Sequence, residues 1–425
     1  MNDVKESRRL LAIFLSLVGL IIGLVVVFSL IQARFSGTGP LCRLVSCICV
    51  EEKKLLVSKG EMGEVVKPAE RDKHRWGLAR CNDGTPFSFL VQLSTSGRSN
   101  KWVIFLMGGG FCDDNAIKCA ERSRSLTSSL AFDDRKFIPM KRSGIFSRDP
   151  IKNPSFYDAN QVFAHYCSSD VWSGNTTERR PTTGSPGGWY FSGRVNVRSM
   201  IEVLIEEYGL NDNDPGLRVL FAGSSAGGAG VLVNADTLTD LLPKTAQAGR
   251  LKLLNDGGMV PDFDDPEYRP GKANSPFRDV LKIDYDFWGS ALNTKCEEAQ
   301  KKTNKQPAEC FYAPVVIPFI VNPEPEGLGV PLMVQYSSID RWALKQHGID
   351  WKTDKDGLEK WRVSSLQLLE KLSGVWLFSG GEEVYHTLIL KDEAWDIGPQ
   401  GSTFREVLTR FWEGGPLERV VFGNP

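Results

Sequence analysis

Histidine is scarce in this chain, at four of 425 residues, and neither an HExxH nor a CxxC pattern occurs. Without ligands at such spacings we expect no metal site, and nothing in the sequence calls for another cofactor. The 51 basic and 52 acidic residues leave a net charge of −1 and are interspersed along the chain. A nucleic-acid-binding chain would carry a basic patch, so this class is not favoured.

One long uncharged segment, residues 10–33, departs from this average composition. It is long enough to cross the ~30 Å hydrocarbon core of a bilayer, and it exceeds the apolar stretch of a signal peptide without an A-x-A-like cleavage site. We therefore expect a retained signal anchor after a short tail, residues 1–9, in a single-pass protein. The alternative is a cleaved signal peptide and a secreted protein. Basic residues flank both ends, so the bias toward a cytoplasmic N-terminus (type II) is slight.

Six cysteines follow this segment and form an even set, as expected for disulfides in an oxidising compartment. They are Cys81, Cys112, Cys119, Cys167, Cys296 and Cys310. Asn175 begins an N-glycosylation sequon, Asn-Thr-Thr. We expect the C-terminal bulk in the secretory lumen or outside the cell. Cys42, Cys47 and Cys49 lie next to the apolar segment, and their role is open.

The rest of the chain divides into a mixed stalk or packed extension, residues 34–75, and one large domain, residues 76–425. Short apolar, β-branched runs in this domain alternate with amphipathic stretches, which predicts a mostly parallel sheet with helices on both faces. The runs are 102–106, 217–222, 251–254, 330–336 and 374–379, and the stretches include 197–208 and 361–372. Ligands of such sheets gather at the carboxyl ends of the strands.

The decapeptide FAGSSAGGAG, residues 221–230, contains two adjacent serines. Only Ser225 has glycine two positions before and after it, Gly223 and Gly227, so it alone fits Gly-x-Ser-x-Gly. An apolar run precedes it and a helix-compatible stretch, 229–242, follows it. This is the context of a nucleophile elbow, in which a strained strand-to-helix turn exposes the serine. We predict that Ser225 is the nucleophile.

A serine nucleophile needs a base and an acid, which in this architecture follow it in the order acid, then histidine. His386 comes after the 374–379 run through a Gly-Gly loop, whereas His347 lies in a polar segment where an exposed side chain is expected. We therefore predict His386 as the base. Asp340 follows the penultimate run and is the predicted acid, with Asp256 as its competitor.

An oxyanion hole is expected in the loop after the run 102–106, which reads Met-Gly-Gly-Gly-Phe-Cys. Glycines there leave backbone N–H groups unshielded. The predicted donors are the N–H groups of Gly109, Gly110 and Ala226.

Several motifs occur in the order found in one family of esterases. They are residues 81–86, 105–112, the spacing of Cys119 and Arg122 before 126–129, residues 153–157 and 166–174, the Ser225 elbow, residues 335–340, and His386. With these motifs in combination, the chain resembles the pectin acetylesterase/Notum family of secretory carboxylesterases. The resemblance implies an α/β-hydrolase fold with a Ser225–Asp340–His386 triad. It also implies disulfides Cys112–Cys119 and Cys81–Cys167, which leaves Cys296–Cys310.

The chain departs from the family pattern at three positions: Met107 replaces an acidic residue, Phe111 stands where an aromatic such as Trp or Tyr is usual, and Ser224 stands before the nucleophile, where Cys or Thr is often found. Family members of this kind remove acetyl groups from polysaccharides or, in the animal Notum branch, a palmitoleoyl group from Wnt proteins. Small-acyl activity is widespread in the family, so the resemblance favours deacetylation of a polysaccharide or glycan.

Two alternatives stay open at this point. The first is removal of a fatty acyl group from a secreted protein, which would need a deep aromatic-lined cavity. Aromatic side chains able to line such a cavity, or equally to lie in the core, are Phe111, Trp172, Phe287, Phe311, Phe319 and Trp342. The second is a membrane-tethered glycan-binding protein with an idle site, against which the complete set of base, acid and oxyanion loop argues.

Overall fold

The computed structural model describes residues 62–421 apart from 98, 113–118, 120, 133–134, 141, 183–184, 260–262, 264, 269–276, 381–383 and 399–400. The predicted tail, anchor and the stalk up to residue 61 lie outside these residues, as do Cys42, Cys47 and Cys49. Among the helices of the described residues, none is both long enough and apolar enough to span a bilayer.

In the described part of the chain, ten strands form one sheet in the order β12-β11-β10-β9-β8-β3-β5-β2-β1-β4, and two more form a hairpin. The sheet strands are β1 (Met62–Val66), β2 (Phe89–Gln92), β3 (Lys101–Leu106), β4 (Phe137–Pro139), β5 (Asn160–Ala164), β8 (Arg218–Ser224), β9 (Leu251–Asp256), β10 (Leu332–Gln335), β11 (Trp376–Ser379) and β12 (Arg419–Val421). The hairpin is β6 (Arg180–Thr182) and β7 (Ser185–Trp189). The strands from β12 through β5 run parallel, and β2, β1 and β4 extend the sheet with antiparallel pairs. The predicted mostly parallel sheet is therefore present.

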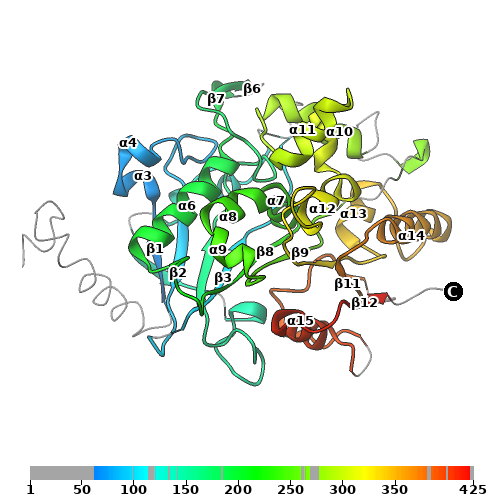
Figure 1. The fold of residues 1–425 in the computed structure, drawn as a ribbon. Coiled ribbons are helices and arrows are strands. Elements are labelled where there is room, and N and C mark those ends of the chain that lie inside the picture. Colours follow the sequence, from blue (N-terminus) through cyan, green and yellow to red (C-terminus); the bar gives the residue numbers. More distant parts are fainter. Residues whose placement is uncertain are drawn as a thin grey trace, which may run out of the picture. The chain divides into compact units, whose positions relative to one another are not determined.

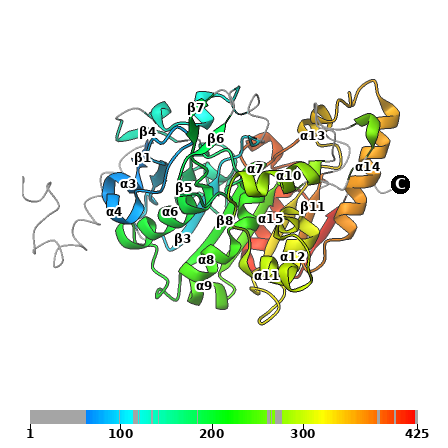
Figure 2. The same ribbon diagram turned by 90° about the horizontal axis from the view of Figure 1, so that it is seen from above.

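Helices cover both faces of this sheet (Figures 1 and 2). They are α3 (Pro68–Arg71), α4 (Lys73–Trp76), α6 (Gly193–Glu207), α7 (Ala226–Val233), α8 (Ala235–Leu241), α9 (Pro243–Gln247), α10 (Phe277–Phe287), α11 (Thr294–Lys302), α12 (Ala313–Val321), α13 (Arg341–Gln346), α14 (Lys355–Glu370) and α15 (Phe404–Glu413). Short 3₁₀ helices are η2 (Arg124–Leu126), η3 (Leu130–Phe132), η4 (Gly144–Phe146), η5 (Pro266–Tyr268), η6 (Pro307–Phe311) and η7 (Asp392–Ala394).

Alternate residues of the central strands enter two different hydrophobic clusters, one on each face of the sheet. In β3, Trp102 and Ile104 join the cluster that contains α6, α7, α12 and α14. Val103 and Phe105 join the cluster that contains α15. Since strand side chains alternate between faces, a strand buried on both sides must be apolar throughout. The continuous apolar runs in the sequence reflect this double burial.

The segment assigned to a stalk or packed extension ends within the folded unit. β1 pairs with β2 and with β4, so residues 62–66 are part of the main sheet. Trp76, at the end of α4, is buried against it and donates a hydrogen bond from Nε1 to Glu202 in α6. The described residues before position 76 therefore belong to the same folded unit as the residues that follow them.

Candidate active site

The Ser225 turn joins β8 to α7 in a strained conformation. Ser225 has φ 56° and ψ −125°, a region that non-glycine residues rarely adopt. β8 ends at Ser224 and α7 begins at Ala226. A Cβ at Gly223 would overlap the carbonyl of Gly227, and one at Gly227 would overlap the carbonyl of Leu106. The two glycines are therefore required by close backbone contacts, as the elbow motif predicts.

His386 and Asp340 form a hydrogen-bonded pair. His386 Nδ1 lies 2.6 Å from Asp340 Oδ2, and the Asp340 side chain is 2% exposed. The other carboxylate oxygen of Asp340 accepts the N–H of Ala343 at 2.9 Å and caps α13. Because an ionised carboxylate only accepts, the proton between the pair is carried by Nδ1. His386 Nε2 is left as the acceptor; it is buried and has no hydrogen-bond partner among the described residues.

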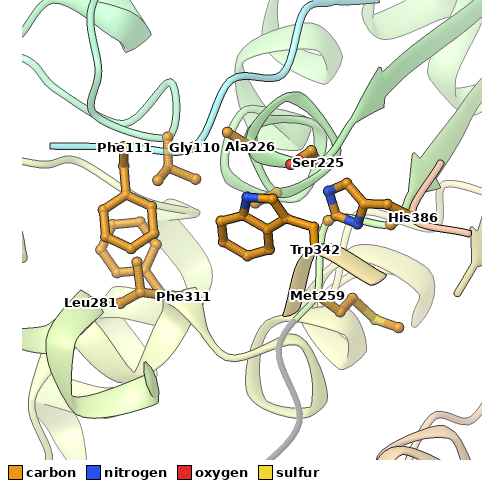
Figure 3. A pocket seen from close by; sticks show the side chains of 13 residues that line it. Gly110, Phe111, Ser225, Ala226, Met259, Leu281, Phe311, Trp342 and His386 are labelled. Atoms are coloured by element: carbon orange, nitrogen blue, oxygen red, sulfur yellow. The ribbon is translucent and has the colours of Figure 1, made fainter. Parts of the chain in front are cut away.

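Ser225 and His386 line the same pocket, with their side chains adjacent (Figure 3). The structure thus brings together all three residues predicted from the sequence as nucleophile, base and acid. Each lies beyond the carboxyl end of a strand: Ser225 after β8, Asp340 after β10 and His386 after β11. Parallel strands deliver such residues to one edge of a sheet.

The structure also describes the two candidates that were not chosen, His347 for the base and Asp256 for the acid. His347 is 4% exposed and its Nδ1 contacts the Tyr268 carbonyl, so the expectation of an exposed side chain is wrong. Its ring packs against Phe263 and Trp361, and burial lowers its pKa. Asp256 lies at the end of β9 and is fully buried, which raises its pKa to about 6. Its carboxylate bonds Ser224 and the backbone of the His386 loop, while Asp340 is bonded to the imidazole.

The glycine loop after β3 faces the elbow. Gly110 and Ala226 line the pocket beside Ser225, and Ala226 is the first residue of α7. The N-terminus of a helix carries partial positive charge, which suits an oxyanion. Gly109, also predicted as a donor, is not among the lining residues; its carbonyl accepts a hydrogen bond from Arg122.

Arg122 fixes the backbone of this loop. Its guanidinium donates to the carbonyls of Gly109 and Phe111, both at 3.0 Å, and Nε donates to Ser169 Oγ at 2.7 Å. Since the C=O and N–H of a peptide plane point in opposite directions, holding the Gly109 carbonyl aims the Gly110 N–H the other way. Burial lowers the pKa of Arg122. The spacing of Arg122 from Cys119 is visible in the sequence, but no sequence pattern indicates this role.

The pocket beside Ser225 is apolar. The empty space at this site, counted together with the open solvent at its mouth, is about 500 Å³. The side chains of the pocket include Phe111, Val171, Met259, Leu281, Phe311 and Trp342. Three of the six predicted aromatic residues thus line it, whereas Trp172 is fully buried beneath the glycine loop and donates to the Met107 carbonyl. Val171, Met259 and Leu281 were not predicted: Val171 lies in the 166–174 motif, which assigns it no role, and Met259 and Leu281 lie in a loop and in helix α10, where no motif was recognised.

Trp342 stands between the catalytic imidazole and the aromatic end of the pocket in Figure 3. Its ring stacks on His386 with centroids 5.4 Å apart and planes 22° from parallel. It belongs to α13, the helix that Asp340 caps, so the acid and this ring are positioned by one element.

Three disulfides are present: Cys81–Cys167, Cys112–Cys119 and Cys296–Cys310. They are the pairings that the family resemblance implied. Asn175 of the sequon is exposed, and its glycosylation stays a prediction. Within residues 62–421 as described, no group of three His, Cys, Asp or Glu side chains is placed to hold a metal ion.

Comparison with solved structures identifies the fold. The Wnt deacylase Notum from Drosophila, in one crystal form, has a TM-score of 0.67 and 24% identity over 81% of this chain and 93% of its own. A second crystal form has a TM-score of 0.66. The chain has a Notum-like α/β-hydrolase fold, as predicted.

Sequence comparison gives relatives of the same kind. The chain is 33% identical over 250 residues to the palmitoleoyl-protein carboxylesterase notum1a of Danio rerio, covering 57% of this chain and 46% of that protein. It is 31% identical to notum1 of Xenopus laevis over 57% of this chain and 47% of that protein. The chain spans about half the length of these curated relatives. Residues 71–372 match the pectinacetylesterase family model, and the chain therefore belongs to the pectinacetylesterase family.

Proposed function

We propose that this chain is a serine carboxylesterase that hydrolyses O-acyl esters through an acyl-enzyme. The observation that carries the proposal is the Asp340–His386 pair, whose free Nε2 shares a pocket with a serine held in a strained elbow. Strain and a polarised histidine at one point indicate a nucleophile prepared for attack. An idle binding protein would have no need of this arrangement.

The first half of the reaction forms the acyl-enzyme. Ser225 Oγ attacks the ester carbonyl carbon while His386 Nε2 takes the hydroxyl proton, and Asp340 stabilises the resulting imidazolium. The carbonyl oxygen becomes an oxyanion bonded by the N–H groups of Gly110 and Ala226. When the intermediate collapses, the C–O bond to the alcohol breaks and Nε2 returns its proton to the leaving oxygen.

The second half releases the acid. His386 Nε2 removes a proton from a water molecule, which attacks the carbonyl carbon of the acyl-enzyme. A second oxyanion forms in the same hole, and its collapse returns the proton to Ser225 Oγ. The carboxylic acid leaves and the free enzyme is restored.

Two candidates are considered for the acyl group of the substrate. The first candidate, an acetyl group of a polysaccharide or glycan, stays a prediction. A specific observation favours the second candidate, a fatty acyl group on a secreted protein: the walls of the pocket beside Ser225 are aliphatic and aromatic. Each buried CH₂ contributes about 0.8 kcal/mol, which an acetyl group could not exploit. The curated relatives named above are palmitoleoyl-protein carboxylesterases.

The compartment is likewise proposed. Three disulfides in the described residues support an oxidising environment, the secretory lumen or the cell exterior. Attachment to a membrane through residues 10–33, and Asn175 glycosylation, remain part of the proposal.

A series of p-nitrophenyl esters from acetate to palmitate tests both parts. We expect hydrolysis by the purified full-length chain, a kcat/KM that rises from acetate toward C8 or longer esters, and a serine-directed fluorophosphonate label on Ser225. Ser225→Ala and His386→Ala should each remove at least about 10³-fold of the activity. Activity that survives in Ser225→Ala would rule out this mechanism, and highest activity on acetate would favour deacetylation instead.

A further inference from the structure

A second buried carboxylate, Asp256, lies where the catalytic segments meet. It is the last residue of β9, and its two neighbours in the sheet are Ser224 on β8 and Gln335 on β10. Ser224 precedes the nucleophile, and Gln335 ends the strand that leads to the acid. The side chain is fully buried, so its charge must be balanced by hydrogen bonds from the protein.

Each oxygen of this carboxylate accepts two hydrogen bonds. Oδ1 accepts the Leu388 N–H at 2.9 Å, and Oδ2 accepts the Ile389 N–H at 3.2 Å and the Ser224 hydroxyl at 2.7 Å. The Gln335 amide satisfies its neighbours when its nitrogen donates to Oδ1 at 2.5 Å. Four donors from three segments therefore converge on one side chain, and none of them is used by the catalytic steps.

The backbone of the same residue adds further links. The Asp256 carbonyl accepts the Ser225 N–H at 2.8 Å. The following residue, Gly257, packs so closely on the His386 carbonyl that an added Cβ would overlap it. Asp256 and Gly257 therefore contact both catalytic segments. The Asp256 carbonyl contacts the turn that holds Ser225, while the Asp256 carboxylate and Gly257 contact the loop that holds His386.

From these contacts we infer that Asp256 is a positioning residue of the esterase site: its carboxylate clamps the Ser224–Ser225 turn to the loop that carries His386. The inference rests on the proposed function. The clamp sets the separation between Ser225 Oγ and His386 Nε2, whereas Asp340 sets the tautomer of the imidazole.

The clamp requires a carboxylate and not merely a polar group. An asparagine side chain fits the space but offers one acceptor atom and one donor atom. Ser224 and Gln335 could each reverse their hydrogen bond, whereas the N–H groups of Leu388 and Ile389 can only donate. Because each faces a different oxygen, Asp256→Asn leaves one of these buried N–H groups without an acceptor. The loop must shift to satisfy it, and the shift moves His386.

The test is Asp256→Asn in the full-length chain, with steady-state kinetics and fluorophosphonate labelling rates. We expect kcat per folded enzyme to fall roughly 10- to 100-fold, because displacement of the base by about 1 Å costs about that much. KM should stay within about twofold, since Asp256 does not line the acyl pocket, and the labelling rate of Ser225 should fall by the same factor as kcat.

A matched control separates positioning from general loss of stability. Asp236 on α8 is also buried and accepts bonds from the Thr294 N–H, the Thr294 hydroxyl and Arg194. Asp236→Asn therefore makes the same chemical change away from the triad. It should lower the melting temperature and leave kcat of the folded fraction within about twofold.

A second variant keeps the test decisive if Asp256→Asn does not fold. Ser224→Ala removes one donor to Oδ2 and should lower kcat about threefold to 10-fold, and Ser224→Thr, which keeps the hydroxyl, should restore it. Wild-type kcat in Asp256→Asn or in Ser224→Ala, with Ser225→Ala inactive, would overturn the inference and leave the proposed function standing. Hydrolysis that survives in Ser225→Ala would overturn the proposed function itself.

Discussion

At the scale of single residues, Trp342 links the chemistry to the acyl pocket. It stacks on the catalytic imidazole and also forms a wall of the pocket. The face of an indole attracts a cation, so the stack favours the imidazolium that forms during attack. The same ring occupies volume that an acyl chain could otherwise use. The stack of Trp342 on the imidazole therefore favours a higher rate, whereas the place of the same ring in the pocket wall limits the length of acyl chain that fits.

Trp342→Ala is expected to separate these effects. Activity on acetate should fall several-fold as the stack is lost, while the ester of highest kcat/KM should move to longer chains because the pocket becomes larger. The ester series described above measures both. Phe287→Ala, which removes an aromatic residue near but not in the pocket lining, serves as the control. An unchanged optimum in Trp342→Ala would mean that the acyl chain does not extend past this ring.

At the scale of elements, helix α7 explains why the elbow is so rich in glycine. Glycine destabilises a helix interior by about 1 kcal/mol relative to alanine, yet α7 holds three in eight residues. Added Cβ atoms would overlap the Leu106 carbonyl at Gly227 and the Trp172 ring at Gly230, and one at Gly228 would lie only 3.0 Å from the Gly258 backbone. The glycines therefore lower the helix propensity of α7, but they allow β3, the loop after β9 and the buried Trp172 to pack closely against it.

Gly227→Ala should therefore destabilise the protein although alanine is the better helix former. The overlap involves backbone atoms of β3, which cannot move aside like a flexible side chain, so we expect a loss of about 1–3 kcal/mol in the free energy of unfolding. Urea denaturation measures it. Gly187→Ala, where the nearest atom belongs to the flexible Arg179 side chain, is the control and should change stability by less than about 1 kcal/mol. A more stable Gly227→Ala protein would contradict the close approach.

Sequence patterns identified the elements that are buried on both faces or that carry a motif. The runs 102–106 and 251–254 lie within β3 and β9, and the amphipathic stretch 197–208 overlaps α6. The predicted helix 229–242 instead divides into α7 and α8 at Asn234, whose amide bonds the carbonyls of Gly230 and Trp172. That partner is distant in sequence, so no local pattern could reveal the break.

The site was predictable where a local motif or chain order specifies the chemistry. Ser225, Asp340 and His386 follow from these rules, and the structure brings them together. The roles of Arg122 and Asp256 depend on hydrogen bonds to remote backbone atoms, which leave no periodic signal. His347 was misjudged because its polar neighbours in sequence say little about Phe263 and Trp361, which enclose it in the fold.

At the scale of the whole molecule, buried carboxyls couple stability to pH. Asp170 is fully buried, accepts bonds from Ser168, Trp172 and Gly193, and has its pKa raised to about 6 by burial. In the unfolded chain an aspartate titrates near 3.9. Between these values the folded protein retains a proton that the unfolded chain has lost. The contribution of Asp170 to stability is therefore greatest below about pH 4, falls as the pH rises, and levels off above about pH 6.

Comparison of the protein with Asp170→Asn isolates this contribution, because asparagine does not titrate. We expect the wild-type free energy of unfolding, relative to that of the variant, to be about 2–3 kcal/mol lower at pH 7 than at pH 4. Denaturant titrations at several pH values measure the difference. A difference that is constant across this range would show that Asp170 titrates normally in the folded protein.

The order of the catalytic segments along the chain also has a consequence for biosynthesis. The hydrogen bond from Leu388 to Asp256 spans 132 residues, and the elbow is synthesised long before the loop that holds its base. Domains emerge from the ribosome N-terminal part first. A nascent chain that already contains Ser225 therefore carries an unactivated hydroxyl. Hydrolytic activity should begin only when the final strands have been translated and have joined the sheet.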